Sequence, residues 1–144
     1  SNITLPRFAK IFSHEGPKTL MCFAARLILI FFLFGLIYNI ILFFAWPFIS
    51  SMVLEDQYSN SLSLIVLWGI YALVLTLRNG AEWCAQAMKL FREQTNTYFI
   101  GAMTTLCFVL GLTIQFSVFG AIIGVILGEL VVISLLISYL WKVK

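Results

Sequence analysis

Charged residues are scarce in this sequence, and its cysteines form no metal or redox motif. Charged residues make up 10% of the 144 residues, against about 25% in soluble domains. Cys22, Cys84 and Cys107 are far apart, with no CxxC or Cys/His spacing, so we expect neither a disulfide framework nor a zinc site, and no cofactor. The nine Lys and Arg residues form no basic stripe, which argues against a nucleic-acid partner.

Hydrophobic residues make up 62% of the chain, with a mean hydropathy of +1.03, which is typical of a membrane protein. The apolar stretches 27–46, 62–84, 98–115 and 119–141 each have about the length needed to cross a bilayer core. Backbone groups find no hydrogen-bond partner in hydrocarbon, so each span must be a helix or part of a closed barrel. Barrel strands would be about ten residues long with alternating polarity, and these stretches do not have that pattern. The sequence therefore predicts an all-α integral membrane fold with four transmembrane helices.

The remaining segments are short and predict no extramembrane domain. We expect a lead at 1–26, a loop at 47–61 that begins where Pro47 ends the first helix, a connection at 85–97, a tight turn at 116–118 and a tail at 142–144. The lead has a helix-start pattern at Thr4-Leu5-Pro6. Apolar Leu5, Phe8, Ala9 and Phe12 share one face there, and Arg7 and Lys10 lie on another. This pattern fits a short interfacial helix, with an ordinary loop as the alternative.

Basic residues are concentrated on one side of the predicted topology. The lead, the second connection and the tail hold eight of the nine Lys and Arg residues, whereas the loops on the other side hold none. Because short cytoplasmic loops carry the basic excess, we expect both termini to be cytoplasmic and the loops at 47–61 and 116–118 to be periplasmic.

Glu129 is the most informative polar residue, because it lies ten residues into the last apolar stretch, about 15 Å from its end. An unpaired carboxylate there is costly, so we expect it to be protonated, paired with a cation or in contact with a wet cavity. The functional interpretation is that Glu129 carries a coupling proton or sodium ion. The alternative is a neutral acid that joins two helices by a hydrogen bond.

Arg78 and Glu82 are one helical turn apart and are expected to pair, with Tyr71 on the same stripe. They could form a cationic wall that binds an anionic headgroup, or Arg78 could extend to the membrane surface and have no such role. Asn39 is a weaker candidate for substrate binding, since such residues more often hydrogen-bond between helices. Three glycines at four-residue spacing, Gly120, Gly124 and Gly128, predict a flat strip for close helix packing.

The segment from Phe119 to Val132, FGAIIGVILGELVV, resembles the last helix of polysaccharide flippases of the Wzx type, in the multidrug/oligosaccharidyl-lipid/polysaccharide exporter superfamily. Leu90-Phe91-Arg92 with Tyr98-Phe99 is similar to the connection before the penultimate helix, and Leu5–Lys10 (LPRFAK) to a cytoplasmic element before a third helix. Ser117 departs from the pattern, where the family often has glycine, and the connection lacks its usual lysine.

This resemblance implies that the chain is the C-terminal third of a transporter of about twelve helices in two bundles, in the bacterial cytoplasmic (inner) membrane. Such proteins move isoprenoid diphosphate-linked oligosaccharides, such as O-antigen units for lipopolysaccharide, by ion-coupled alternating access. The expected partners are the lipid-linked oligosaccharide, membrane lipids, a proton or sodium ion and the remaining helices.

Other functions are compatible with the same residues. A drug/cation antiporter or a lipid II flippase would share the fold. From another class, the chain could be a structural membrane subunit or a fragment of an integral-membrane transferase. We do not expect an enzyme, because the loops offer only Glu55-Asp56 on one side and the isolated His14 on the other.

Overall fold

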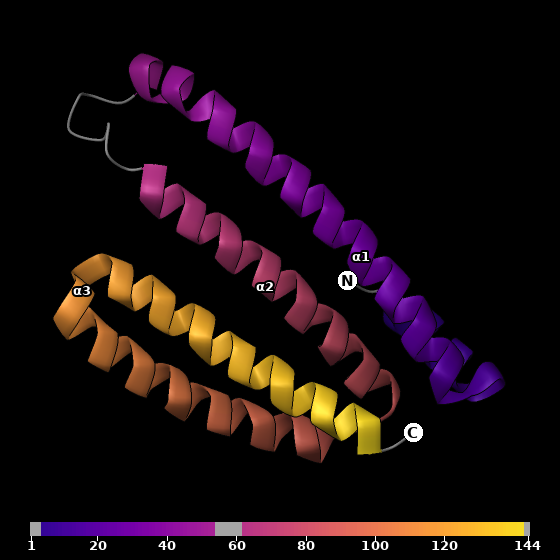
Figure 1. Ribbon diagram of the computed structural model, residues 1–144. Coiled ribbons are helices and arrows are strands. Elements are labelled where there is room, and N and C mark those ends of the chain that lie inside the picture. Colours follow the sequence, from indigo (N-terminus) through magenta and orange to yellow (C-terminus); the bar gives the residue numbers. More distant parts are fainter. Residues whose placement is uncertain (1–3, 54–61, 143–144) are drawn as a thin grey trace.

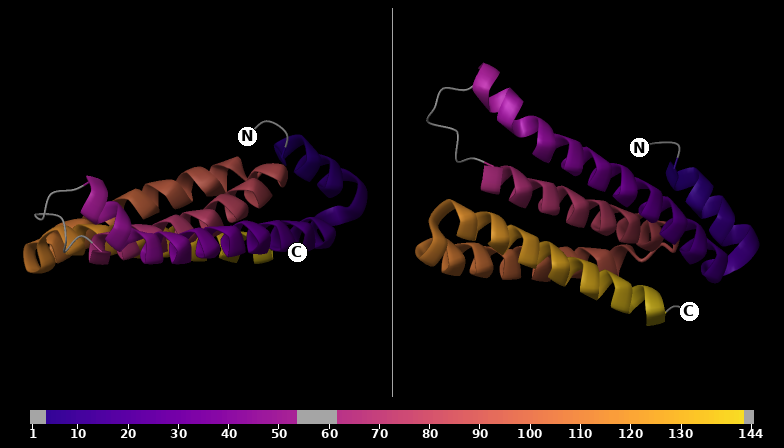
Figure 2. Two further views of the ribbon diagram at one scale, coloured as in Figure 1. Left: turned by 90° about the horizontal axis from the view of Figure 1, so that it is seen from above. Right: turned by 45° about the horizontal axis from the view of Figure 1, so that its top comes forward.

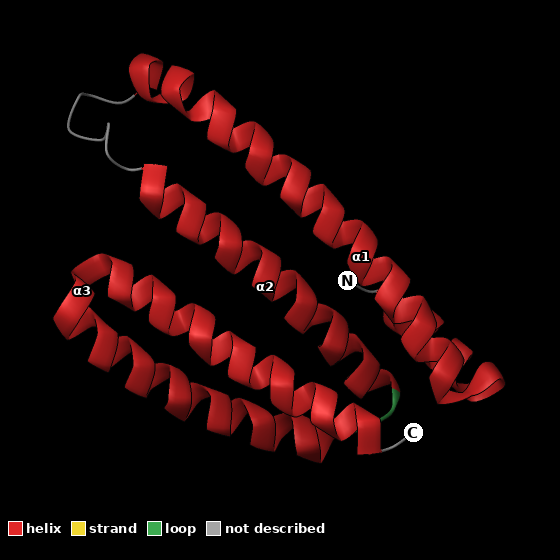
Figure 3. Cartoon of the chain, in the orientation of Figure 1, coloured by secondary structure: helices red, strands yellow, loops and turns green. Residues whose placement is uncertain are grey.

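The computed structural model describes residues 4–53 and 62–142 as three long helices (Figures 1 and 3). They are α1 (Thr4–Val53), α2 (Leu62–Ala87) and α3 (Phe91–Lys142), and the described residues include no strand. Each helix is long and apolar enough to cross a membrane. The all-α prediction is therefore confirmed, and the three apolar helices indicate a membrane-embedded protein.

Two of the helices bend sharply at single residues. Gly16 (φ 85°) divides α1 into an N-terminal arm, residues 4–15, and a long arm, residues 17–53. Ser117 (φ 52°, ψ −130°) divides α3 into a first arm, residues 91–116, and a second arm, residues 118–142, which run antiparallel side by side (Figure 1). The third and fourth apolar stretches are thus the two arms of one bent helix, so the described residues form three long helices rather than four. A separate loop is unnecessary because one non-helical residue reverses the chain.

Two helices extend beyond the predicted boundaries. The helix does not end at Pro47 but continues to Val53, since an apolar helix tolerates the lost hydrogen bond of an internal proline. Only residues 88–90 separate α2 from α3, so most of the connection expected at 85–97 is helical. Lys89 (φ 59°) closes α2, with Leu90 N–H donating to the Ala85 carbonyl at 2.9 Å, the pattern of a Schellman cap. Residues 54–61, which include Glu55-Asp56, and residues 143–144 lie outside the described residues, as do 1–3.

The lead contains the predicted short helix, but the helix packs on the rest of the molecule. Phe8 is fully buried and contacts Phe23 and Trp83 edge to face, with ring centroids 5.5 and 6.2 Å apart. Ala9, expected on the same apolar face, is exposed, and the side chain of Leu5 lies outside the described set. The bend at Gly16 therefore folds the N-terminal arm back against α1 and α2 (Figure 2).

The hydrophobic core lies at one end of the bundle, where the Gly16 bend, the α2–α3 connection and the C-terminal end of α3 come together (Figures 1 and 2). α2 lies between the other two helices and packs against both. We name this end the basic end, because the segments that reach it carry seven of the nine Lys and Arg residues: Arg7, Lys10, Lys18, Arg26, Lys89, Arg92 and Lys142. The core is formed by Phe8, Leu20, Ala24, Ala81, Cys84, Ala85, Ala87, Met88, Val132, Leu136 and Leu140.

We expect Ser117→Gly to raise the free energy of unfolding by about 1 kcal/mol, because a residue with a side chain is strained at positive φ and glycine is not. Thermal unfolding in detergent measures the change. Ser134→Gly is the control, since Ser134 lies in regular helix, where glycine is destabilising. A loss of stability in both variants would contradict strain at the bend.

Candidate functional site

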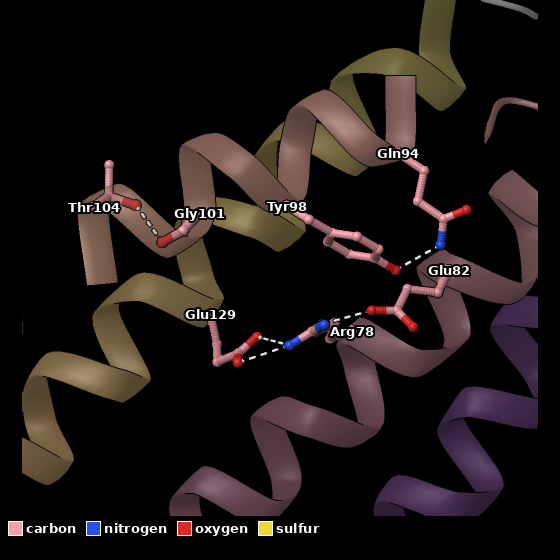
Figure 4. A network of polar contacts seen from close by, with 7 residues as sticks. All are labelled: Arg78, Glu82, Gln94, Tyr98, Gly101, Thr104 and Glu129. Carbon is pink, nitrogen blue, oxygen red and sulfur yellow. Dashed lines mark hydrogen bonds and ion pairs between the residues drawn. The ribbon is translucent and has the colours of Figure 1, made fainter. Parts of the chain in front are cut away.

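Arg78 of α2 pairs with two carboxylates, that of Glu82 on the same helix and that of Glu129 on the second arm of α3 (Figure 4). Its Nε donates to Oε1 of Glu82 at 2.5 Å. Its Nη1 donates to both carboxylate oxygens of Glu129 at 2.8 Å. The side chains of Arg78, Glu82 and Glu129 are 27%, 16% and 13% exposed, so the network is largely enclosed within the helices.

The local and the long-range parts of this network have different origins. Arg78 and Glu82 are in register because residues four apart share a helix face, which confirms the predicted pair. Glu129 is 51 residues away in the chain and is brought to Arg78 by the fold of α3 against α2. Of the three states expected for Glu129, the structure shows pairing with a cation. One guanidinium faces two carboxylates, so the network has a formal charge of −1 when both are ionised.

Tyr98 and Gln94, from the first arm of α3, complete the network. The ring centroid of Tyr98 lies 5.2 Å from the Arg78 Cζ, within the range of a cation–π contact. Gln94 Nε2 donates to the Tyr98 hydroxyl at 2.5 Å, and Gln94 is buried. The guanidinium is thus held by charge on two sides and by an aromatic face on another (Figure 4).

An open groove of about 380 Å³ lies beside the network. Arg78, Tyr98, Thr105 and Glu129 supply its polar groups, and its remaining walls are apolar or glycine: Gly101, Ala102, Leu106, Val109 and Val132. An anion that enters this groove can compete with Glu129 for the guanidinium. A cation that enters it can be bound by the carboxylates.

Two predicted site residues lie elsewhere. Asn39 is at the contact between α1 and α2, where its Nδ2 donates to the Gly35 carbonyl at 2.8 Å. Its amide fills the space beside Gly69, where an added Cβ would be 1.8 Å from Oδ1. Tyr71 packs edge to face on Trp68 with ring centroids 5.5 Å apart. Among the described residues, neither Asn39 nor Tyr71 contacts the Arg78 network, and their substrate-binding role stays a prediction.

The predicted glycine strip forms the contact between the two arms of α3. Gly120, Gly124 and Gly128 are buried, and an added Cβ at each would approach the first arm to less than 3.0 Å. The nearest atoms are the Leu112 carbonyl oxygen at 2.0 Å, Val109 N at 2.7 Å and Thr105 Oγ1 at 1.8 Å. The strip therefore brings the first arm, with Tyr98 and Thr105, close to Glu129.

Sequence reasoning missed Gln94, Tyr98 and Thr105 as site residues. Gln94, Tyr98, Gly101 and Thr105 follow one another at spacings of four, three and four residues, which places them on one helix face. This stripe of polar and small residues was the sequence pattern that could have identified them as site residues. It was obscured because the stretch was expected to begin only at Tyr98, which left Gln94 in a connection.

Comparisons with known protein families, with curated proteins and with solved structures give no match for this chain.

Proposed function

We propose that the chain is part of a membrane transporter in which the groove beside Arg78 binds the anionic headgroup of an isoprenoid diphosphate-linked oligosaccharide. The observation that carries this proposal is a guanidinium held by two carboxylates within apolar helices, next to an open groove. Ionisable groups in such segments are costly and most often mark substrate or ion pathways. Arginine also matches the geometry of phosphate oxygens, which accept hydrogen bonds from two of its N–H groups.

The network provides a chemical route to ion coupling. A diphosphate that accepts hydrogen bonds from Arg78 replaces Glu129, which holds Nη1 through both carboxylate oxygens. The freed carboxylate then lies in an apolar region without a cation, so it takes up a proton or a sodium ion. Release of the diphosphate returns Glu129 to Arg78 and expels the proton or ion. Glu129 is therefore the coupling residue in this proposal, and Glu82 holds the guanidinium in both states.

We further propose that the chain crosses the membrane four times, with the two arms of α3 as separate crossings and both termini in the cytoplasm. The clustering of basic segments at one end supports this topology. In the proposed assembly the chain is the C-terminal part of a flippase of about twelve helices in the bacterial cytoplasmic membrane. The close glycine contact between the arms of α3 suits helices that slide during alternating access.

A drug/cation antiporter is the second candidate function. The specific observation in its favour is the excess of carboxylates, since two acids face one guanidinium. A cationic substrate would bind Glu129 directly and release Arg78. Export of lipid-linked intermediates and drug efflux, measured in the same strain, separate the two functions.

The test of the proposed function is Glu129→Gln in the full protein, expressed in a strain that lacks its own copy. Gln cannot exchange a proton, so we expect glycan export to fall at least about tenfold, the scale of one lost charged hydrogen bond. Glu93→Gln is the matched control, because Glu93 is another acid of α3 outside the network. Undiminished export with Glu129→Gln would refute ion coupling at this residue.

A further inference from the structure

A second polar groove lies between the N-terminal arm and the long arm of α1, apart from the Arg78 network. Its volume is about 540 Å³. Both arms supply charged or polar groups to its walls, together with two apolar residues. The lining residues are Arg7, Lys10, Ile11, His14, Glu15, Thr19 and Phe23.

The backbone bend creates this groove. Gly16 has a φ of 85°, which a glycine adopts without strain, and Pro17 begins the long arm. Arg7, Ile11 and His14 share a face of the N-terminal arm by their spacing, as do Thr19 and Phe23 on the long arm. The bend turns these two faces toward each other, and Figure 2 shows the two arms folded back in this way.

The side chain of Arg7 contacts an aromatic ring of the long arm. Its neighbour Phe8 is fully buried against Phe23 and Trp83, which anchors the N-terminal arm. The Arg7 Cζ lies 5.5 Å from the centroid of the Phe23 ring. A guanidinium stacked on an aromatic ring keeps its N–H groups available for an acceptor.

The groove has an excess of positive charge. Arg7 and Lys10 are both cationic, and Glu15 is the one acid in the lining. Within residues 4–53 and 62–142, neither Arg7 nor Lys10 forms an ion pair. An anion with several oxygen acceptors, such as a phosphate, would therefore complement the groove.

We propose that this groove binds the phosphate group of an anionic lipid headgroup. It lies at the basic end of a bundle whose three helices are apolar enough to cross a membrane, and in the topology proposed above this end lies at the lipid headgroups. Basic pockets at this depth recognise anionic headgroups. The bound phosphate would join the N-terminal arm to the long arm of α1. Soluble phosphate has the same chemistry and is the other possible source.

Native mass spectrometry of the full chain in detergent tests the proposal, with phosphatidylglycerol and phosphatidylcholine as probes. We expect retention of phosphatidylglycerol over phosphatidylcholine, and a loss of about tenfold or more in Arg7→Gln/Lys10→Gln. The matched control is Arg26→Gln/Arg92→Gln, which removes the same charge from exposed positions outside the groove. Its retention should stay within about twofold of the unmodified chain.

Lys10→Gln alone provides a second variant at an exposed position, should the double substitution disturb folding, and we expect it to weaken retention several-fold. Competition with excess inorganic phosphate identifies the source. Retention that survives the competition assigns the groove to a lipid headgroup, and retention that is lost assigns it to soluble phosphate and overturns the lipid assignment. Equal lipid retention by the groove variants and the control variant would overturn the site altogether.

Discussion

Arg78→Ala is expected to lower the free energy of unfolding by about 2–3 kcal/mol, measured by denaturant titration in detergent micelles. The substitution leaves two carboxylates, those of Glu82 and Glu129, without their cation. Removing one partner of a fully buried ion pair costs about 3–5 kcal/mol. The Arg78 side chain is 27% exposed, so part of that cost is screened by solvent and the expected value is smaller.

A neutral version of the whole network is the control for this prediction. Arg78→Met combined with Glu82→Gln and Glu129→Gln removes all three charges at once, so no carboxylate is left unpaired. Replacing an entire buried ion-pair network is often neutral, and we expect most of the lost stability to return. The stability of Arg78→Lys should lie between that of Arg78→Ala and that of the unmodified protein. Lysine keeps the positive charge but lacks the planar set of N–H donors of the guanidinium. A change below about 0.5 kcal/mol in Arg78→Ala would favour a guanidinium that reaches the membrane surface.

Gly120→Ala should lower the free energy of unfolding by about 2–3 kcal/mol, a typical cost of overpacking at a close contact. A Cβ at this position would lie 2.0 Å from the Leu112 carbonyl oxygen. This is a backbone atom, so it cannot move aside by a change of rotamer. The two arms of α3 would have to separate, which would also move Tyr98 and Thr105 away from Glu129. Thermal unfolding in detergent measures the loss.

Gly111→Ala is the matched control, because Gly111 lies in the same helix and an added Cβ there meets nothing within 4 Å. Alanine is the better helix former by about 1 kcal/mol, so this variant should be as stable as the parent or more stable. Both substitutions improve helix propensity, but only the Cβ added at Gly120 would clash with a backbone atom. Equal stability in the two variants would refute the close packing of the α3 arms.

The sequence was sufficient for the features that depend on local spacing. Residue composition predicted membrane helices, the four-residue interval between Arg78 and Glu82 predicted their ion pair, and the repeat from Gly120 to Gly128 predicted a close helix contact. The assignment to the flippase family stays a prediction, since no comparison matches the chain.

Features that depend on how distant helices align could not be predicted. The bond between Arg78 and Glu129 requires a particular register of α2 against α3, and no local pattern encodes it. Pro47 was expected to end a helix, but α1 continues for six residues to Val53. An internal proline removes one backbone hydrogen bond, and an apolar helix tolerates that loss. Burial of Phe8 depends on the bend at Gly16, so its spacing alone could not show which surface it meets.

The separation of Arg78 from Glu129 along the chain has a consequence for biogenesis. In a chain that crosses the membrane four times, as proposed here, α2 is synthesised with Arg78 and one carboxylate, Glu82, before the second carboxylate. The second carboxylate emerges 51 residues later. We therefore expect α2 to be less stably inserted in a nascent chain that stops before Glu129 than in one that includes Glu129.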